Sequence, residues 1–178
     1  MNGSRLRVAH TAELSSGDLA AARALIYDAF DDATEADWEH CLGGIHAMLW
    51  NGDRLIAHGA VIQRRIIYQR RPLRTGYVEG VAVRADRRRQ GLGGAVMSEL
   101  ERVIKAAYEL GALGSSIDGL SFYAARGWQR WQGRSYALTP DGIIRTPDDD
   151  DGIFVLPIAI PIDVTTDLTC DFREGEPW

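Results

Sequence analysis

The stretch that most constrains the fold of this chain is Gly76–Val83, which continues without a break into Arg84–Gly94. Gly76–Val83 is rich in β-branched and apolar residues, a composition typical of a central strand. The following residues are rich in arginine and glycine and lead into a helix that begins near Leu92. Glycines at a tight bend let successive N–H groups converge, and the helix adds the positive end of its dipole. We therefore expect an anion site, suited to a phosphate, at this turn.

Taken alone, a glycine-rich turn is also compatible with an ordinary connection from strand to helix. The dinucleotide fingerprint Gly-x-Gly-x-x-Gly is absent, and no Gly-Lys-Ser/Thr of a P-loop follows. The run Arg88-Arg-Gln-Gly-Leu-Gly93 instead resembles the Arg/Gln-x-x-Gly-x-Gly/Ala signature of the GCN5-related N-acetyltransferases (GNAT). In that superfamily the loop holds the pyrophosphate of acetyl-CoA.

Length and composition predict one soluble domain spanning residues 1–178. The chain is 46% hydrophobic and 25% charged, which is ordinary for a soluble protein with a proper core. Its N-terminus lacks the apolar stretch of a signal peptide, and its longest apolar run, Phe154–Ile162, is too short to span a bilayer. We expect a cytoplasmic protein without membrane contact. Cys41 and Cys170 lack metal-ligand spacing and are expected to be buried or idle thiols.

The charge is strongly polarised along the chain. Nine arginines lie between Arg64 and Arg89, whereas Asp28–Glu39 holds six acids and no base, and Asp141–Trp178 holds ten acids against two arginines. A basic middle suits a phosphate-bearing cosubstrate, and acidic flanks suit a cationic partner. The net charge of −5 argues against nucleic acid. The run Asp148–Asp151, taken alone, fits a solvated loop equally well.

Periodicity, caps and turn residues predict the remaining elements. His46 and His58 fall within predicted strands, and the lack of a Cys, an Asp or a second His at ligand spacing argues against a metal site. The expected elements are, in order, a strand at Arg5–His10, a helix after Ser15–Asp18 carrying Leu19–Phe30, a helix from Thr34 stopped by Gly43, a hairpin of Ile45–Trp50 and Arg54–Tyr68 around Asn51-Gly-Asp53, the strand Gly76–Val83, a helix from Leu92 ended by Gly111, a strand at Ala112–Ile117, a short helix capped by Asp118 and closed by Gly127, the strands Trp128–Leu138 and Ile153–Ile160, and an irregular tail from Pro161. This order predicts a mixed α/β (α+β) layered domain.

Further stretches make the resemblance specific. Phe122-Tyr-x-x-x-Gly-Trp128 is similar to the second hallmark of the GNAT superfamily. Other segments resemble one branch, the aminoglycoside 2′-N-acetyltransferases, from about Ala29 to the end of the chain. These segments are Asp37-Trp-Glu-His, Leu42-Gly-Gly-Ile-His46, Gly76-Tyr-Val-Glu-Gly80, Tyr108-Glu-Leu-Gly-Ala112, Arg145-Thr-Pro-Asp148 and Cys170-Asp-Phe-Arg-x-Gly-x-x-Trp178.

The resemblance implies the GNAT fold, a single central mixed sheet whose middle strands splay, flanked by helices. The pantetheine arm of acetyl-CoA would lie in the splay, bonded to the backbone near Val81 and Val83, and the N–H of Val81 would hold the oxyanion. No metal is implied. The residues implied for the coenzyme are Val81, Ala82, Val83, Arg88, Arg89, Gln90, Gly91, Leu92, Gly93 and Gly94.

Two side chains are candidates for proton transfer. An ammonium has no lone pair with which to attack, so the acceptor amine must lose a proton, and Glu79 is the candidate base, acting through one water. Its structural alternative is a buried charge paired with an arginine. Tyr123 resembles the residue that protonates the departing thiolate, and its alternative is a core tyrosine with a satisfied hydroxyl.

The resemblance also implies an acidic acceptor site, because an aminoglycoside carries several ammonium groups. The chain departs from the family where Gly114 replaces a serine and Glu176 an aspartate, and Asp31 competes with Asp32 for one role. The expected ordered tail, about 161–178, would present the α-carboxylate of Trp178. The implied substrate residues are Asp32, Asp37, Glu79, Gly80 (backbone), Gly114, Asp149, Glu176 and Trp178.

The implied reaction is direct transfer of acetyl from acetyl-CoA to the 2′-amine of an aminoglycoside in a ternary complex, as in antibiotic resistance. The same chemistry on another polyamine or amino sugar stays open. So does a non-catalytic acetyl-CoA-binding sensor. The resemblance further implies paired subunits, a homodimer.

Overall fold

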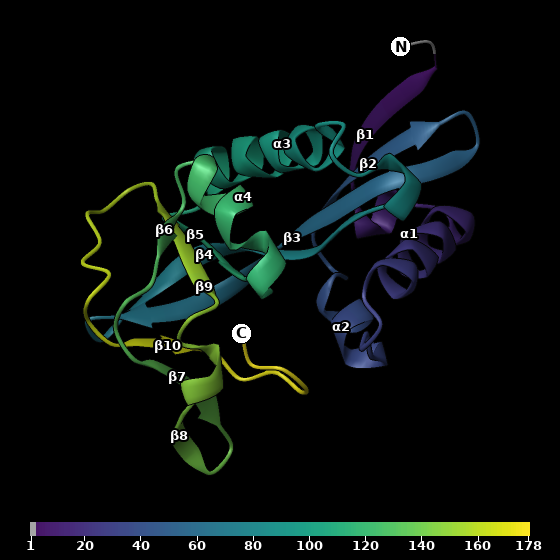
Figure 1. The fold of residues 1–178 in the computed structure, drawn as a ribbon. Helices are drawn as coiled ribbons and strands as arrows, with labels where there is room; N and C mark the ends of the chain where they lie inside the picture. Colours follow the sequence, from purple (N-terminus) through teal and green to yellow (C-terminus); the bar gives the residue numbers. More distant parts are fainter. Residues whose placement is uncertain (1–2) are drawn as a thin grey trace. The chain divides into compact units, whose positions relative to one another are not determined.

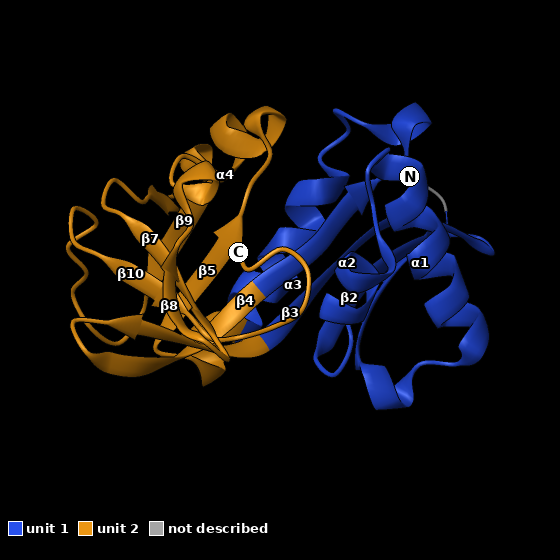
Figure 2. Ribbon diagram, turned by 90° about the horizontal axis from the view of Figure 1, so that it is seen from below, with its two compact units in different colours: residues 1–62, 78–103 blue, residues 63–77, 104–178 orange. Residues whose placement is uncertain are grey.

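The computed structural model describes residues 3–178 and divides into two compact units, which are coloured separately in Figure 2. Unit 1 comprises Met1–Ile62 and Val78–Val103, and unit 2 comprises Gln63–Tyr77 and Ile104–Trp178. Three elements run from one unit into the other: β3, β4 and α3. The expectation of a single domain stays a prediction, and each unit is described by itself.

Unit 1 combines an antiparallel sheet with two N-terminal helices (Figure 1). The β2–β3 hairpin predicted from Asn51-Gly-Asp53 is confirmed, with Asn51 opposite Arg54 and Gly52 at φ +57°. β1 pairs antiparallel with β2. The elements are β1 (Ser4–His10), η1 (Thr11–Glu13), α1 (Ser16–Ala29), α2 (Glu35–His40), β2 (Ile45–Asn51), the first part of β3 (Arg54–Tyr68), the last part of β4 (Arg71–Val83), η2 (Ala85–Arg87) and most of α3 (Leu92–Ala107).

Capping boxes begin both N-terminal helices, as their sequences predict. The Ser15 hydroxyl accepts from the N–H of Asp18 at α1, and the Thr34 hydroxyl accepts from the N–H of Asp37 at α2. Their apolar faces pack with β2 and β3 in one core that includes Ile26 and Trp38.

Unit 2 is built on a mixed sheet with the strand order β6-β9-β5-β4-β3-β10-β7-β8. β4 and β5 are parallel, as are β7 and β10, whereas β5 and β9 are antiparallel. The expectation of a mixed sheet with helices is therefore confirmed. Besides the ends of β3, β4 and α3, the elements are β5 (Leu110–Gly114), η3 (Ile117–Gly119), α4 (Leu120–Ala125), β6 (Gln129–Arg130), β7 (Ser135–Thr139), β8 (Gly142–Arg145), η4 (Pro147–Asp149), β9 (Ile153–Pro157) and β10 (Leu168–Cys170).

The structure corrects the boundary between α3 and the strand after it. The helix ends at Ala107 rather than at Gly111, and β5 begins at Leu110. Gly111 is a strand residue at a close approach, because a Cβ there would lie 3.1 Å from side-chain atoms of Ile104, Leu156 and Trp128. The glycine permits packing across the sheet and is not a helix stop.

Three other boundaries also differ from expectation. The strand expected at Trp128–Leu138 is broken between Arg130 and Ser135, where the N–H groups of Gln132 and Gly133 donate to the carbonyl of Val164 in the tail, at 2.8 and 2.9 Å. A Cβ at Gly133 would lie 1.7 Å from the carbonyl oxygen of Thr166, so glycine permits this close approach. Asp118 lies inside η3, and α4 begins at Leu120 after Gly119, which offers no side-chain cap. The tail expected to be irregular contributes β10, which pairs with β3 and β7. Contacts distant in sequence accompany the first and the last of these features.

Candidate active site

The candidate base Glu79 lies on β4 next to a backbone irregularity in unit 1. Gly80 has φ +56°, and a Cβ there would come within 2.6 Å of Cys41 Sγ and 2.9 Å of Ile26 Cδ1. Only glycine fits this backbone, which bends the strand as a bulge does. Glu79, Gly80 and Val81 are half-buried, so the strand presents them at a partly accessible surface.

The arginine- and glycine-rich loop of unit 1 has the backbone expected of an anion cradle. Arg89 and Gly91 have φ +60° and +78°, and α3 begins directly afterwards with Leu92. The first intrahelical bond runs from the N–H of Ala95 to the carbonyl of Gly91, 3.0 Å. The N–H groups of the first turn have no earlier carbonyl in the helix to bind. Arg88, Arg89 and Gln90 are exposed, and the half-buried Gly93 and Gly94 complete the loop.

The other predicted residues of β4 continue this strand toward the loop. Ala82 is buried at 1% exposure, and Val83 is half-buried. The guanidinium Nε of Arg88 donates to the carbonyl of Val83, 3.3 Å, which ties the loop back to the end of the strand. The residues assigned to a phosphate-bearing cosubstrate thus form one continuous segment of unit 1.

Two predicted carboxylates lie around the start of α2. Asp32 is exposed in the turn that follows α1, as is Asp31. Asp37 is half-buried, and its Oδ2 accepts from the N–H and hydroxyl of Thr34, at 2.7 and 2.8 Å. The geometry therefore gives Asp37 a helix-capping role, whatever further contact it makes with a substrate.

Three residues predicted for the acceptor meet in one pocket of unit 2: Gly114, Asp149 and Trp178. The pocket has a volume of about 220 Å³. A Cβ at Gly114 would lie 3.2 Å from the main-chain carbon of Trp178, so a larger residue would press on the tail at this point. The other lining residues are Ser115, Ser116, Asp148, Gly152 and Ile153.

The carboxyl group of Asp149 is tuned by this surrounding. Burial, followed by the negative charges of Glu176 and Asp148, raises the pKa of Asp149 to about 6. Glu176 is exposed on the tail and acts on Asp149 through its charge. A cation entering the pocket would relieve this repulsion, so the pocket favours a positively charged ligand.

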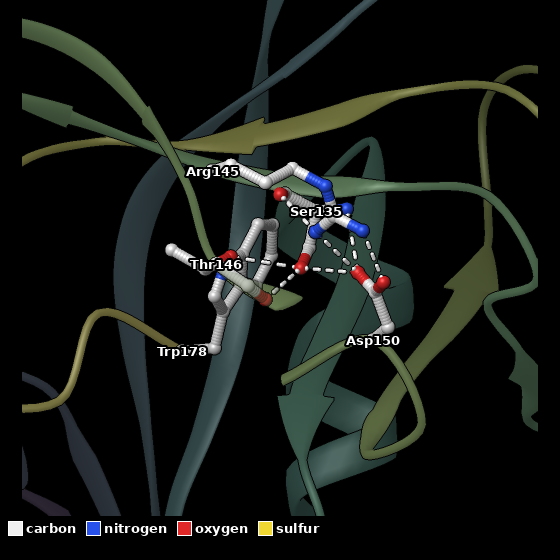
Figure 3. A network of polar contacts seen from close by, with 5 residues as sticks. All are labelled: Ser135, Arg145, Thr146, Asp150 and Trp178. Carbon is white, nitrogen blue, oxygen red and sulfur yellow. Dashed lines mark hydrogen bonds and ion pairs between the residues drawn. The ribbon is translucent and has the colours of Figure 1, made fainter. Parts of the chain in front are cut away.

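A polar network holds the indole of Trp178 in place (Figure 3). Trp178 is 7% exposed, and its Nε1 donates to Thr146 Oγ1, 3.1 Å. The buried Ser135 Oγ lies 2.8 Å from both Thr146 Oγ1 and Asp150 Oδ1. Arg145 forms an ion pair with Asp150. The pKa of the Asp150 carboxyl is lowered to about 2, chiefly because the side chain of Arg145 donates a hydrogen bond to it. The network is therefore anchored on a carboxylate that stays ionised.

Further contacts hold the tail before Trp178. The buried Arg64 donates to Asp171 Oδ1, 2.8 Å, and lies over the ring of Tyr77 at 4.6 Å from its centroid. Arg173 also lies over this ring, 5.4 Å from its centroid, and the thiol of Cys170 donates to the carbonyl of Pro177, 3.3 Å. The tail is thus packed and bonded to β3 and β4 within unit 2.

The candidate acid Tyr123 lies on α4 among aromatic rings. It is 9% exposed, and its ring centroid lies 5.1 Å from that of Phe122, 6.3 Å from Trp128 and 5.9 Å from Phe154. Burial raises the pKa of its hydroxyl to about 12. The phenol is therefore protonated at neutral pH and can act as a proton donor.

Sequence reasoning missed the residues that position others. Ser135 carried no signal of function, Asp150 lay unassigned in the acidic run Asp148–Asp151, and Thr146 lay without a role inside a stretch that resembles the family. Within residues 3–178, no three His, Cys, Asp or Glu side chains gather as metal ligands would. No helix of that described part is long and apolar enough to cross a bilayer.

Comparison with known proteins decides the family. A family model described as an acetyltransferase (GNAT) domain matches residues 10–131 of this chain. The chain belongs to the GNAT acetyltransferases. Among curated relatives of this acetyltransferase, the aminoglycoside 2′-N-acetyltransferase of Mycolicibacterium fortuitum is 48% identical over 177 residues, which cover 97% of this chain and 91% of the relative. The resemblance found in the sequence motifs is confirmed.

Solved structures support the fold of the acetyltransferase. The GNAT family N-acetyltransferase YhbS of Escherichia coli, solved in complex with CoA, has a TM-score of 0.67 at 16% identity, covering 94% of this chain and 89% of that chain. An acyl-CoA N-acyltransferase from Pseudomonas aeruginosa has a TM-score of 0.61 at 16% identity, covering 88% of this chain and 100% of that chain. At these identities the likeness shows the fold alone, and it confirms the expected GNAT fold.

Proposed function

We propose that this acetyltransferase transfers acetyl from acetyl-CoA to the 2′-amino group of an aminoglycoside. The observation that carries the proposal is the 48% identity, over 97% of the chain, to an aminoglycoside 2′-N-acetyltransferase. We take residues 1–178 as one acetyltransferase domain. The same resemblance carries our expectations of a homodimer and of a role in antibiotic resistance, and we also propose a cytoplasmic location.

The donor side of the proposal rests on unit 1. Acetyl-CoA supplies an activated acyl group on a thioester. The loop Arg88–Gly94, with two left-handed residues before a helix start, fits a diphosphate through its N–H groups and arginines. The N–H of Val81 would face the thioester oxygen and stabilise the charge that develops there.

The acceptor side rests on the pocket of unit 2. Asp149 and Asp148 place carboxylates in the pocket, and the main chain of Trp178 lies beside Gly114. Carboxylates and main-chain oxygens match the ammonium and hydroxyl groups of an aminoglycoside. Asp32, Asp37 and Gly80 in unit 1, and Glu176 in unit 2, are the further residues we assign to this substrate.

The proton transfers are assigned to Glu79 and Tyr123. Glu79, through a water, would take the proton that the 2′-ammonium must lose before its nitrogen can attack. Tyr123 would donate a proton to the departing thiolate of coenzyme A. Because the pKa of Tyr123 is raised to about 12, its hydroxyl carries that proton at neutral pH.

The proposal is tested with two aminoglycosides that differ only at position 2′, where one carries an amine and the other a hydroxyl. Thiol release from acetyl-CoA is followed with a thiol reagent. We expect release with the 2′-amine compound and a rate near background with its partner. Equal rates would favour acetylation of another amine, and release independent of any amine would favour an acetyl-CoA-binding sensor.

The ionisation of Asp149 gives a second prediction, on binding. Because the pKa of Asp149 is about 6, its carboxylate is protonated as the pH falls through that value and attraction for the substrate is lost. We expect the Kd for the aminoglycoside, measured by calorimetry without acetyl-CoA, to rise by about tenfold from pH 7 to pH 5. With a pKa of about 6, the ionised fraction of Asp149 falls by about tenfold between these two pH values.

Asp149→Asn should bind weakly at both pH values and lose this dependence. The matched control is Asp151→Asn, which removes one charge from the same loop at a side chain that is 97% exposed. It should keep the wild-type pH dependence. A pH dependence that survives in Asp149→Asn would show that another group titrates.

A further inference from the structure

Two buried histidines of unit 1 have no part in the assignments above. His46 on β2 and His58 on β3 are both 0% exposed. Their ring centroids lie 5.3 Å apart, and Nδ1 of His46 lies 3.0 Å from Nε2 of His58. At its other ring nitrogen, Nδ1, His58 is 2.9 Å from the carbonyl oxygen of Gly80. The two buried rings are therefore hydrogen-bonded to each other and to the carbonyl of Gly80, the residue between Glu79 and Val81.

The hydrogen bonds along this path have a defined direction. A carbonyl oxygen only accepts, so Nδ1 of His58 carries its proton and Nε2 of His58 is the acceptor. His46 must then donate from Nδ1, which leaves its Nε2 as an acceptor. The hydroxyl of Thr11 lies 2.8 Å from His46 Nε2 and donates to it, since the other acceptor within its reach, the carbonyl of Gly44, is farther away at 3.3 Å. The Thr11 oxygen accepts in turn from the N–H of Gly43, 2.9 Å. Thr11, His46 and His58 thus form a directed chain that ends on Gly80.

Both rings stay neutral at working pH, which keeps this direction. Burial, and then the neighbouring charges of His58 and His10, lower the pKa of His46 to about 3. Burial also lowers the pKa of His58 to about 4, against the opposing effect of its bond to Gly80. A neutral imidazole has one donor and one acceptor nitrogen, as the chain requires.

The end of the chain fixes a peptide unit that glycine alone would leave mobile. The carbonyl of Gly80 and the N–H of Val81 belong to one planar trans peptide and point in opposite directions. Because Gly80 adopts φ +56°, its backbone has access to conformations closed to other residues, and rotation of this peptide would turn both groups. The bond from His58 holds the carbonyl inward and so directs the N–H of Val81 the other way.

We propose that the chain Thr11–His46–His58 is a positioning device that fixes the peptide between Gly80 and Val81 for catalysis. It rests on the proposed function, in which the N–H of Val81 stabilises charge on the thioester oxygen. His58 touches neither substrate and acts through the backbone. Its loss should reduce kcat more than it raises KM, because that charge develops in the transition state.

The tautomers can be read on the wild-type protein without any substrate. A long-range ¹H–¹⁵N spectrum of ¹⁵N-histidine-labelled protein distinguishes a proton on Nδ1 from one on Nε2. We expect both His46 and His58 to carry the proton on Nδ1 at pH 7. A proton on Nε2 of His58 would overturn the proposal, because Nδ1 of His58 could then no longer donate to the carbonyl of Gly80. This readout stands even if the wild type acetylates no aminoglycoside, an outcome that would instead refute the proposed function.

Two substitutions of His58 separate positioning from packing. The amide nitrogen of asparagine can occupy the place of Nδ1 and donate to Gly80, whereas leucine fills similar space without a donor. For His58→Leu we expect kcat lower by about 10²-fold, the range for loss of one oxyanion-hole donor, with KM for the aminoglycoside changed little. For His58→Asn we expect kcat within about fivefold of wild type, although His46 loses its acceptor and both variants are less heat-stable.

Equal kcat for the two His58 variants, or a loss confined to KM, would overturn the proposal. If His58→Leu does not fold, Thr11→Val takes its place, since it removes the first donor at nearly constant volume. Thr11→Val should give mixed histidine tautomers and a several-fold lower kcat, with Thr11→Ser restoring both. Unchanged tautomers and kcat in Thr11→Val would contradict a connected chain.

Discussion

Glu79→Gln is expected to lower kcat for acetyl transfer to a 2′-amine by about 10²–10⁴, the range for a general base. Glutamine keeps the length and shape of the side chain but cannot take up a proton from the acceptor ammonium. Binding should change far less than turnover, so most of the effect should appear in kcat. Steady-state kinetics across pH 5–10 measure it, and the variant should lose the acidic limb of the wild-type kcat/KM profile.

The matched control is Glu99→Gln on α3, where the carboxylate pairs with Arg102 at 2.8 Å on the surface. This variant removes the same charge and should retain wild-type kinetics. A near-wild-type rate for Glu79→Gln across the whole pH range would reassign Glu79 as a charge with a structural partner.

Tyr123→Phe should lower kcat by about 10², the lower part of the range for a general acid. The phenylalanine ring keeps the contacts with Phe122, Trp128 and Phe154, and only the hydroxyl is lost. Because the pKa of Tyr123 is about 12, no alkaline loss of activity below that pH is expected from its ionisation. The defect should shrink with an acyl donor whose thiol is more acidic, since such a thiolate leaves without a proton.

Tyr136→Phe is the control for this change. Tyr136 is half-buried on β7, under the guanidinium of Arg145 at 5.4 Å from the ring centroid, and its hydroxyl has no assigned role. A Tyr123→Phe enzyme with wild-type kcat and only a lower Tm would return Tyr123 to the core.

Local chemistry explains which parts of the fold were readable in the sequence. The capping boxes at Ser15 and Thr34, the hairpin at Asn51-Gly-Asp53 and the helix start at Leu92 each depend on residues within a few positions. The predictions for these elements are confirmed. The helix stop expected at Gly111 was wrong, because that glycine lies in β5 and makes room for Ile104 on α3, Leu156 on β9 and Trp128.

The parts that could not be predicted depend on partners distant in sequence. β10 exists because the tail pairs with β3 and β7, and the break at Gly133 exists because the backbone of Thr166 passes close by. The spacing of hydrophobic residues along the sequence does not show which distant segments pair or pass close to each other. Because the ends of most chains are poorly ordered, there was no reason to predict from the sequence that the tail forms a strand.

For the candidate site too, some residues were predictable from the sequence, whereas their hydrogen-bond partners were not. Resemblance supplied Gly114, Asp149 and Trp178, and the structure brings these three into one pocket. Which hydrogen-bond donors point toward a site residue is seen only in the three-dimensional structure. Neither the bond from Trp178 to Thr146 nor that from His58 to Gly80 has a sequence spacing that would suggest it.

Product analysis shows which nitrogen of the drug receives the acetyl group. The purified protein is incubated with acetyl-CoA and an aminoglycoside that bears a 2′-amine and several other amines, and the product is examined by mass spectrometry and two-dimensional NMR. We expect one added acetyl group, as an amide on the 2′ nitrogen. Acetyl on any other nitrogen, or coenzyme consumed without an acetylated drug, would contradict it.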